Sequence, residues 1–208
     1  RETFALYDFA GNKIYSERFN PPQEYTDEKE LKVLIGRIKK RLKAYGLTDK
    51  KILNTTIAVT GQIDEEKHCF IHSGRFKIFE GDEQGRIYKI FEDAFNAPVT
   101  MKNNVAFMAL GESEMGGFES NYGMSLFLYV GYGIAASVLH KGKALSGWRG
   151  YAGEIGYNKF ESGESLFSNV TVSYMIQKSK PYLQTLDIEG LKQAYQENEK
   201  VKQIEIRE

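Results

Sequence analysis

Apolar and polar residues alternate in short runs at the start of the chain, which is typical of half-buried β-strands. One run covers residues 3–9 and a second covers residues 13–19, with a Gly11–Asn12 turn signal between them. Two alternating runs joined by such a turn predict a β-hairpin. The Pro21–Pro22 pair is expected to end the second strand, because proline cannot continue a hydrogen-bonded ladder.

The spacing of apolar positions then changes to that of an amphipathic helix. Asp27 is a suitable N-cap, the helical pattern runs to about Tyr45, and Gly46 is placed to end the helix. Its apolar face consists of Leu31, Leu34, Ile35, Ile38 and Leu42. Residues 55–60 form a short β-rich run that ends at Gly61, where the backbone can approach a ligand closely.

Strands and helices alternate along the rest of the chain, which places it in the α/β class. The patterns predict a polar β segment over residues 62–80, helices over 84–96 and 104–115, strands over 99–102, 125–130 and 134–139, and helices over 164–179 and 187–197 separated by Pro181.

Composition narrows the possible classes of protein. The 28 basic residues balance the 28 acidic ones, so this chain alone is a poor candidate for a nucleic-acid binder. No apolar run reaches the roughly 18–20 residues that span a bilayer, and no signal peptide opens the chain, so no membrane partner is expected. A single cysteine, Cys69, fits a cytoplasmic protein. The first strand lacks a preceding start and residues 204–208 lack a pairing partner, so we expect a fragment of a longer protein.

Two adjacent carboxamides, Asn103 and Asn104, lie between a predicted strand and a predicted helix. Ligand sites of α/β folds concentrate at such junctions. The donors and acceptors of two carboxamides match the paired hydroxyls of a sugar. The alternative is that Asn104 only caps the helix.

A glycine-rich segment, residues 147–157, could fold its backbone tightly around a ligand. Within it, Glu154 could accept hydrogen bonds from two neighbouring hydroxyls, and Tyr157 adds a phenol. The alternative is a surface loop with a solvated glutamate.

Gly131 and Gly133 flank Tyr132 between two predicted strands, where they could present N–H groups to a phosphate or simply form a hairpin turn.

The candidates for a metal site are weaker. His68, Cys69 and His72 cluster, but on a strand His68 and His72 would face one way and Cys69 the other. A second ligand pair at the usual spacing is missing, so zinc is not expected.

Four segments resemble, in order and spacing, the ROK family of bacterial sugar kinases and sugar-responsive transcriptional repressors. They are Ile57–Asp64, Pro98–Glu112, Gly131–Ala135 and Gly147–Tyr157, and the similarity runs from about residue 3 to about residue 158. The resemblance implies an actin-like ATPase (ribonuclease H-like) fold of two lobes with a sugar in the cleft. It implies an N-terminal lobe over residues 1–115 and part of a C-terminal lobe over residues 116–208.

The resemblance also implies residue roles. In the family's kinases an asparagine that contacts the sugar falls on Asn103, and the aspartate that acts as catalytic base falls on Asn104. The family's Glu-X-Gly-His sugar motif falls on residues 154–157, so that Glu154 is retained and the histidine, normally also a zinc ligand, is Tyr157. Together with Gly61, these residues form the expected sugar-binding set.

Several family features are altered. The cysteine-rich zinc loop is absent, the phosphate-side Gly-Thr-Gly-Ile-Gly pattern has Tyr132 and Ala135 at its threonine and third glycine, and the N-terminal phosphate loop would precede Arg1. A carboxamide cannot take a proton from a sugar hydroxyl, and losing a general base typically costs about 10² to 10⁴ in rate.

We therefore expect the sugar-binding effector domain of a ROK-type transcriptional regulator. It would bind a sugar or sugar phosphate without a cofactor, contact DNA through a segment outside these residues, and form a homo-oligomer. The alternative is an ATP-dependent sugar kinase, which would need ATP and magnesium. A third possibility is a structural pseudoenzyme that binds no sugar.

Overall fold

The computed structural model describes residues 2–20, 24–47, 51–73, 75–116 and 123–202. The contacts among them divide the chain into two compact units, Arg1–Asn103 and Asn104–Glu208. The predicted Pro21–Pro22 strand end and the C-terminal residues 204–208 lie outside the described residues.

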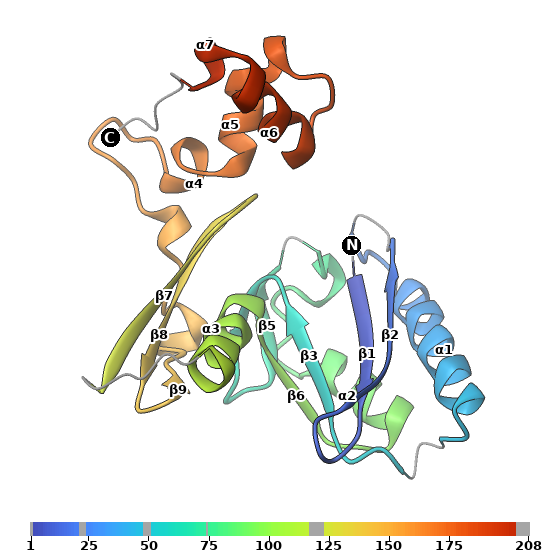
Figure 1. The fold of residues 1–208 in the computed structure, drawn as a ribbon. Helices are drawn as coiled ribbons and strands as arrows, with labels where there is room; N and C mark the ends of the chain where they lie inside the picture. The colour runs from blue at the N-terminus through green and yellow to red at the C-terminus, as the bar shows by residue number, and fades with distance from the viewer. Residues whose placement is uncertain (1, 21–23, 48–50, 74, 117–122, 203–208) are drawn as a thin grey trace. The chain divides into compact units, whose positions relative to one another are not determined.

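The first unit is a mixed α/β unit, and its elements follow the predicted order (Figure 1). They are β1 (Glu2–Tyr7), β2 (Lys13–Phe19), α1 (Glu28–Ala44), β3 (Thr55–Val59), β4 (Gln62–Asp64), β5 (Cys69–His72), the 3₁₀ turn η2 (Lys77–Phe79), α2 (Arg86–Phe95) and β6 (Val99–Asn103). The predicted hairpin is confirmed, since β1 and β2 pair antiparallel. Strands β4 and β5 also pair antiparallel, whereas β3 and β6 pair parallel.

Helix α1 begins and ends where the sequence predicts. The Asp27 carboxylate accepts the Lys29 N–H at 2.9 Å, and the Glu30 carboxylate accepts the Asp27 N–H at 3.4 Å, which forms a capping box. Gly46 follows the last turn with a left-handed φ of 67°, as expected for a residue just after a helix. The predicted apolar face contains the buried residues Leu31, Ile35 and Leu42.

The interior of the first unit is aromatic. Phe70 and Phe79 are fully buried, and the rings of Tyr25 and Phe76 stack with centroids 4.9 Å apart. The prediction of a polar segment over residues 62–80 is therefore wrong in its burial. The hairpin of β4 and β5 supplies part of the core, and its alternation of polar and apolar residues concealed this.

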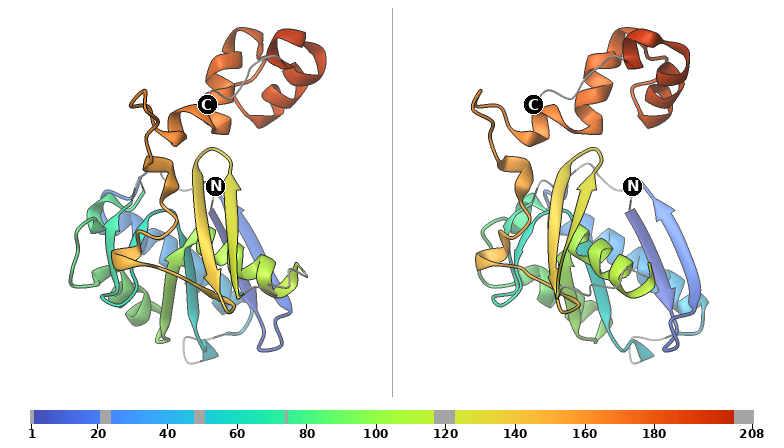
Figure 2. Two further views of the ribbon diagram at one scale, coloured as in Figure 1. Left: turned by 90° about the vertical axis from the view of Figure 1, so that its left-hand side faces the viewer. Right: turned by 60° about the vertical axis from the view of Figure 1, so that its left-hand side comes forward.

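The second unit is built around a hairpin and a group of helices (Figures 1 and 2). Its elements are α3 (Asn104–Met115), β7 (Met124–Val130), β8 (Ile134–His140), β9 (Lys143–Ala144), the 3₁₀ turns η3 (Trp148–Gly150) and η4 (Ile155–Tyr157), α4 (Leu166–Asn169), α5 (Val172–Ser179), η5 (Lys180–Tyr182), α6 (Ile188–Glu197) and α7 (Glu199–Lys202). Strands β7, β8 and β9 form an antiparallel sheet in that order.

Two boundaries in the second unit differ from the sequence expectation. Helix α3 packs against β8 and β9, so it groups with the second unit, whereas the sequence placed the division after residue 115. The single helix expected over residues 164–179 is two helices, because the Thr171 hydroxyl accepts the Tyr174 N–H and starts α5 afresh. Among the described residues, no helix is both long and apolar enough to cross a membrane.

Candidate functional site

The carboxyl ends of the parallel strands β3 and β6 bring two of the predicted sugar-binding residues together. Val59 pairs with Asn103 at the last position of the register. One step further along, the Asn103 side-chain N–H donates to the Gly61 carbonyl at 2.9 Å. This edge of a parallel sheet is where α/β folds place their ligands.

Gly61 occupies a position that only glycine fits. Its φ is 145°, and a Cβ built there would lie 2.6 Å from the His72 carbonyl oxygen. The backbone at the end of β3 therefore passes directly against the end of β5. A side chain at this position would push the two apart, and the contact between Gly61 and Asn103 would be lost with it.

Ser73 fastens this region, and sequence reasoning missed it. Its hydroxyl donates to the Thr60 carbonyl at 3.0 Å and accepts the Phe76 N–H at 3.1 Å. Its own N–H donates to the Glu80 carboxylate at 2.9 Å. Partial burial raises the pKa of Glu80, but this N–H bond and the nearby His72 and Lys77 outweigh it, so the net pKa is lowered. A lone serine gives no sequence signal for such a role.

Asn104 begins α3 and is therefore the first helical residue. Asn103 ends β6 and directly precedes the helix. Helix N-termini favour groups with negative charge, so an aspartate at this position would be held in its ionised form. A carboxamide can donate and accept hydrogen bonds but cannot take up a proton under ordinary conditions.

In the second unit, the glycine-rich segment is docked on β8. The Ala136 N–H donates to the Gly153 carbonyl at 2.8 Å. A Cβ at Gly153, where φ is 88°, would lie 1.9 Å from the Ala136 oxygen, and one at Gly156 would lie 2.8 Å from the Ile134 oxygen. These two glycines are therefore required for close backbone packing, and the segment is not a loose surface loop.

Glu154 lies between these two contacts. Its N–H donates to the Tyr151 carbonyl at 3.3 Å, and Glu154 as a whole is half-buried. Tyr157 ends η4 and is 68% exposed, so its phenol reaches solvent. The backbone on both sides of Glu154 is therefore held against β8.

The Gly131–Gly133 loop closes the β7–β8 hairpin and is tied to α5. The Gly131 N–H donates to the Gly133 carbonyl at 2.8 Å, while the Gly131 carbonyl accepts the Val172 N–H at 2.7 Å. The Tyr132 carbonyl accepts the Ser173 hydroxyl at 2.9 Å. A phosphate needs backbone N–H donors, whereas these contacts occupy one of them and turn two carbonyls toward α5.

The histidine and cysteine cluster does not have the predicted geometry. Strand β5 begins at Cys69, so the expectation that His68 and His72 share a strand face is wrong. His68 has a left-handed φ of 54° and stacks on Tyr88 with centroids 4.7 Å apart, while the His72 Nδ1 lies 3.0 Å from the Glu80 carboxylate. Within the described ranges, no three or more His, Cys, Asp or Glu side chains gather as a metal site.

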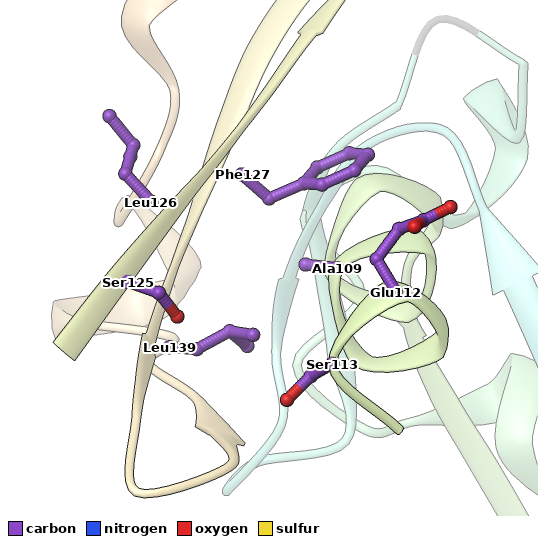
Figure 3. A pocket seen from close by; sticks show the side chains of 7 residues that line it. All are labelled: Ala109, Glu112, Ser113, Ser125, Leu126, Phe127 and Leu139. Carbon is purple, nitrogen blue, oxygen red and sulfur yellow. The ribbon is translucent and has the colours of Figure 1, made fainter. Parts of the chain in front are cut away.

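A small pocket of about 190 Å³ lies within the second unit between α3 and the β7–β8 hairpin (Figure 3). Phe127 points toward α3, while Leu126 points to the other side of the hairpin. The lining residues are Ala109, Glu112, Ser113, Ser125, Leu126, Phe127 and Leu139. None of them belongs to the predicted sugar-binding set, so this pocket does not coincide with the candidate site.

The family model described as the ROK family matches residues 2–171. The chain therefore belongs to the ROK family. Among curated relatives, the xylose repressor of Caldicellulosiruptor bescii is 30% identical over 152 residues, which cover 73% of this chain and 37% of the repressor. The chain thus spans well under half the length of that relative.

Solved structures share the fold at low sequence identity. A ROK family transcriptional regulator, a homologue of the E. coli MLC protein, superposes with a TM-score of 0.73 at 17% identity. The matched region covers 94% of this chain and 53% of the regulator's chain. A ROK family glucokinase from Streptomyces griseus, solved with glucose and AMPPNP, superposes with a TM-score of 0.69 at 13% identity. The matched region covers 96% of this chain and 69% of the glucokinase chain. The predicted α/β, actin-like fold is confirmed.

Proposed function

We propose that this chain is the sugar-binding effector part of a ROK-type transcriptional regulator and that it lacks efficient kinase activity. In this proposal Asn103 and Asn104 donate to and accept from sugar hydroxyls, and the Glu154 carboxylate accepts from them. Gly61 holds Asn103 in place through its carbonyl. The observation that carries the proposal is Asn104, a carboxamide on the first residue of α3, where the family resemblance implies the catalytic base.

Magnitudes favour binding over catalysis. Removing a general base costs about 10² to 10⁴ in rate, and phosphoryl transfer also requires groups that position and neutralise the phosphates. The contacts of the Gly131–Gly133 loop with α5 supply neither. Sugar binding needs only hydrogen-bonding groups of fixed geometry. The bond from Asn103 to Gly61 and the backbone bond of Glu154 to Tyr151 support this part of the proposal.

The hypothesis that the chain is part of a transcriptional regulator is supported by the repressor and the regulator among the similar proteins. In the proposed mechanism a sugar binds one conformation better than another and shifts the population toward it. DNA would be contacted by a part of the protein outside these residues, and the expected homo-oligomer belongs to the same proposal. A sugar kinase is the alternative, since a glucokinase shares the fold.

Calorimetric titration tests the proposal directly. The panel is D-xylose, D-glucose, 6-deoxy-D-glucose, the methyl glycosides of xylose and glucose, and glucose 6-phosphate. We expect at least one member to bind, and Glu154→Gln to weaken that binding at least tenfold, because a charge-assisted acceptor is lost. The exposed Glu161→Gln is the matched control and should leave binding unchanged. Folded protein that binds no member of the panel would contradict the proposal.

A further inference from the structure

Two large aromatic side chains of the glycine-rich segment are left in solvent. Trp148 is 75% exposed and Tyr151 is 53% exposed. Their rings stack on each other with centroids 6.0 Å apart and an interplanar angle of 12°, and the Arg149 guanidinium lies 5.4 Å from the centre of the Trp148 ring. Tryptophan is highly buried on average, so an ordered, exposed pair of this kind indicates a binding surface.

The pair is held by a closed loop. The Ala152 N–H donates to the Ser146 carbonyl at 3.0 Å, and the Tyr151 N–H donates to the Trp148 carbonyl at 3.1 Å. Arg149 has a left-handed φ of 51°, which is costly for a residue with a side chain. The backbone conformation that presents Trp148 is therefore fixed by the loop at some cost in free energy.

The same loop leads directly into Glu154. The Glu154 N–H donates to the Tyr151 carbonyl, and the preceding residue, Gly153, is packed against β8. The aromatic pair and the carboxylate are thus presented by consecutive turns of one docked segment. One offers an apolar, flat surface and the other offers an anionic hydrogen-bond acceptor.

We propose that the ligand is a glycoside with a second ring, and that this ring packs its flat face against Trp148 and Tyr151 while Glu154 holds hydroxyls of the first ring. This rests on the proposed function, because it assumes that Glu154 binds a sugar. A pyranose carries its C–H groups on its faces and its hydroxyls around its rim, and an aryl aglycone is flat and apolar throughout. Both present the ring face that an aromatic side chain packs against.

The test compares ligands with one and two rings. The probes are methyl β-D-xyloside, phenyl β-D-xyloside and xylobiose, with methyl β-D-glucoside, phenyl β-D-glucoside and cellobiose as the second series. In one series at least, a two-ring ligand should bind about tenfold tighter than the methyl glycoside, from the apolar area that the second ring buries. If the phenyl glycoside binds more tightly than the disaccharide, the second ring of the ligand is an aryl group. If the disaccharide binds more tightly, the second ring is a sugar.

Variants assign the difference to the aromatic pair. Trp148→Ala should remove the advantage of the two-ring ligand and leave the methyl glycoside affinity within about twofold, while Trp148→Phe keeps part of the advantage. Tyr195→Ala removes an aromatic side chain from α6 that is also exposed, at 55%, and should change nothing. Trp148 is the only tryptophan in the chain, so its fluorescence should change on binding of a two-ring ligand.

Three results would overturn the proposal. Equal affinity for one-ring and two-ring ligands refutes the proposed contact of a second ring with the aromatic pair, while the sugar-binding function stands. Loss of methyl glycoside affinity in Trp148→Ala, with Trp148→Phe equally impaired and the fold intact, assigns Trp148 to the first ring instead. No binding of any glycoside probe, while a free sugar or sugar phosphate of the titration panel binds, refutes this inference alone. No binding of either set refutes the sugar-binding function as well.

Discussion

The two units of the chain are stabilised in different ways. In residues 1–103 a contiguous core of large side chains includes Phe70, Phe79 and Phe91. In the described part of residues 104–208 the buried apolar side chains are fewer and mostly smaller: Val105, Ala109, Ala136, Leu139, Tyr174, Ala194 and Val201. One face of β7 even exposes a row of apolar residues, namely Met124, Leu126, Leu128 and Val130.

This difference extends to the candidate binding residues. Asn103 and Gly61 lie on strand ends that are backed by the aromatic core and fastened by Ser73. Glu154 depends instead on backbone packing of Gly153 against β8. The aromatic core therefore supports the first set in addition to the close backbone approach at Gly61, whereas the second set depends on close backbone approach.

The largest effect should come from the aromatic core. Phe70→Ala removes a fully buried ring, and we expect a loss of about 3–5 kcal/mol in the free energy of unfolding. Denaturant unfolding followed by circular dichroism measures it. Phe9→Ala is the control, because Phe9 is 94% exposed and should contribute little. Equal effects of the two variants would show that the core does not stabilise the chain as described.

The close backbone contact in the second unit should give the next largest effect. Gly153→Ala would place a Cβ 1.9 Å from the Ala136 oxygen at a φ of 88°. We expect about 3 kcal/mol of destabilisation, together with loss of sugar affinity as the Glu154 segment leaves β8. Thermal unfolding and titration measure the two effects.

Gly163→Ala separates the contact from the backbone strain. Gly163 has a similar φ of 84°, but nothing lies within 4 Å of its Cβ position. Only the conformational cost of about 1 kcal/mol should remain. If both glycine variants lose stability equally, the contact with Ala136 is not what holds the segment.

A smaller effect is expected at Ser73, which fastens the end of β3. Ser73→Ala removes the hydroxyl that bonds to Thr60 and Phe76, and we expect a loss of about 1–2 kcal/mol in the free energy of unfolding. The exposed Ser16→Ala on β2 should be nearly neutral. Hydrogen exchange should also quicken at Phe76 in the first variant alone, and unchanged exchange there would contradict the assigned bond.

The smallest effect is the pH dependence of the Glu17 cluster on β2. Hydrogen bonds from Arg41, Tyr15 and Arg37 lower the pKa of Glu17 from 4.5 to about 2. A carboxylate with a lowered folded-state pKa stabilises the fold above its unfolded pKa. This contribution should therefore decline as pH falls from about 4.5 toward 2. Surface ion pairs contribute little, so the change should be small.

Comparison of Glu17→Gln with the unmodified chain measures that contribution. Unfolding midpoints of the two should converge between pH 4.5 and 2, whereas an exposed control, Glu66→Gln, should follow the unmodified chain throughout. A constant difference between Glu17→Gln and the unmodified chain across this range would contradict the assignment.

The elements that sequence predicts best carry local signals. Helix α1 has an N-cap, a capping-box glutamate and a regular apolar face, so Asp27 and Gly46 mark its ends. The position of Asn103 and Asn104 at a strand–helix junction was predictable for the same reason, because the strand and helix patterns meet there. The family resemblance then added the chemical meaning of Asn104.

The rest depends on contacts between residues far apart in sequence. The burial of β4 and β5 follows from packing with Tyr25 and Phe76, which alternation along one strand does not reveal. The bond of Ser73 to Thr60 spans thirteen residues, and the exposure of Trp148 depends on how its loop closes. The division of the expected helix at Thr171 comes from a cap that competes with helical continuation.

The proposed lack of efficient phosphoryl transfer is tested most directly by assaying sugar phosphate formation. The assay uses ATP, magnesium and a sugar that binds in the titration, with the unmodified chain and its Asn104→Asp variant side by side. We expect sugar binding by both, no product above background from the unmodified chain, and at most slow turnover from the variant. Product formed by the unmodified chain at a kinase-like rate of about 1–100 s⁻¹ would contradict the proposal.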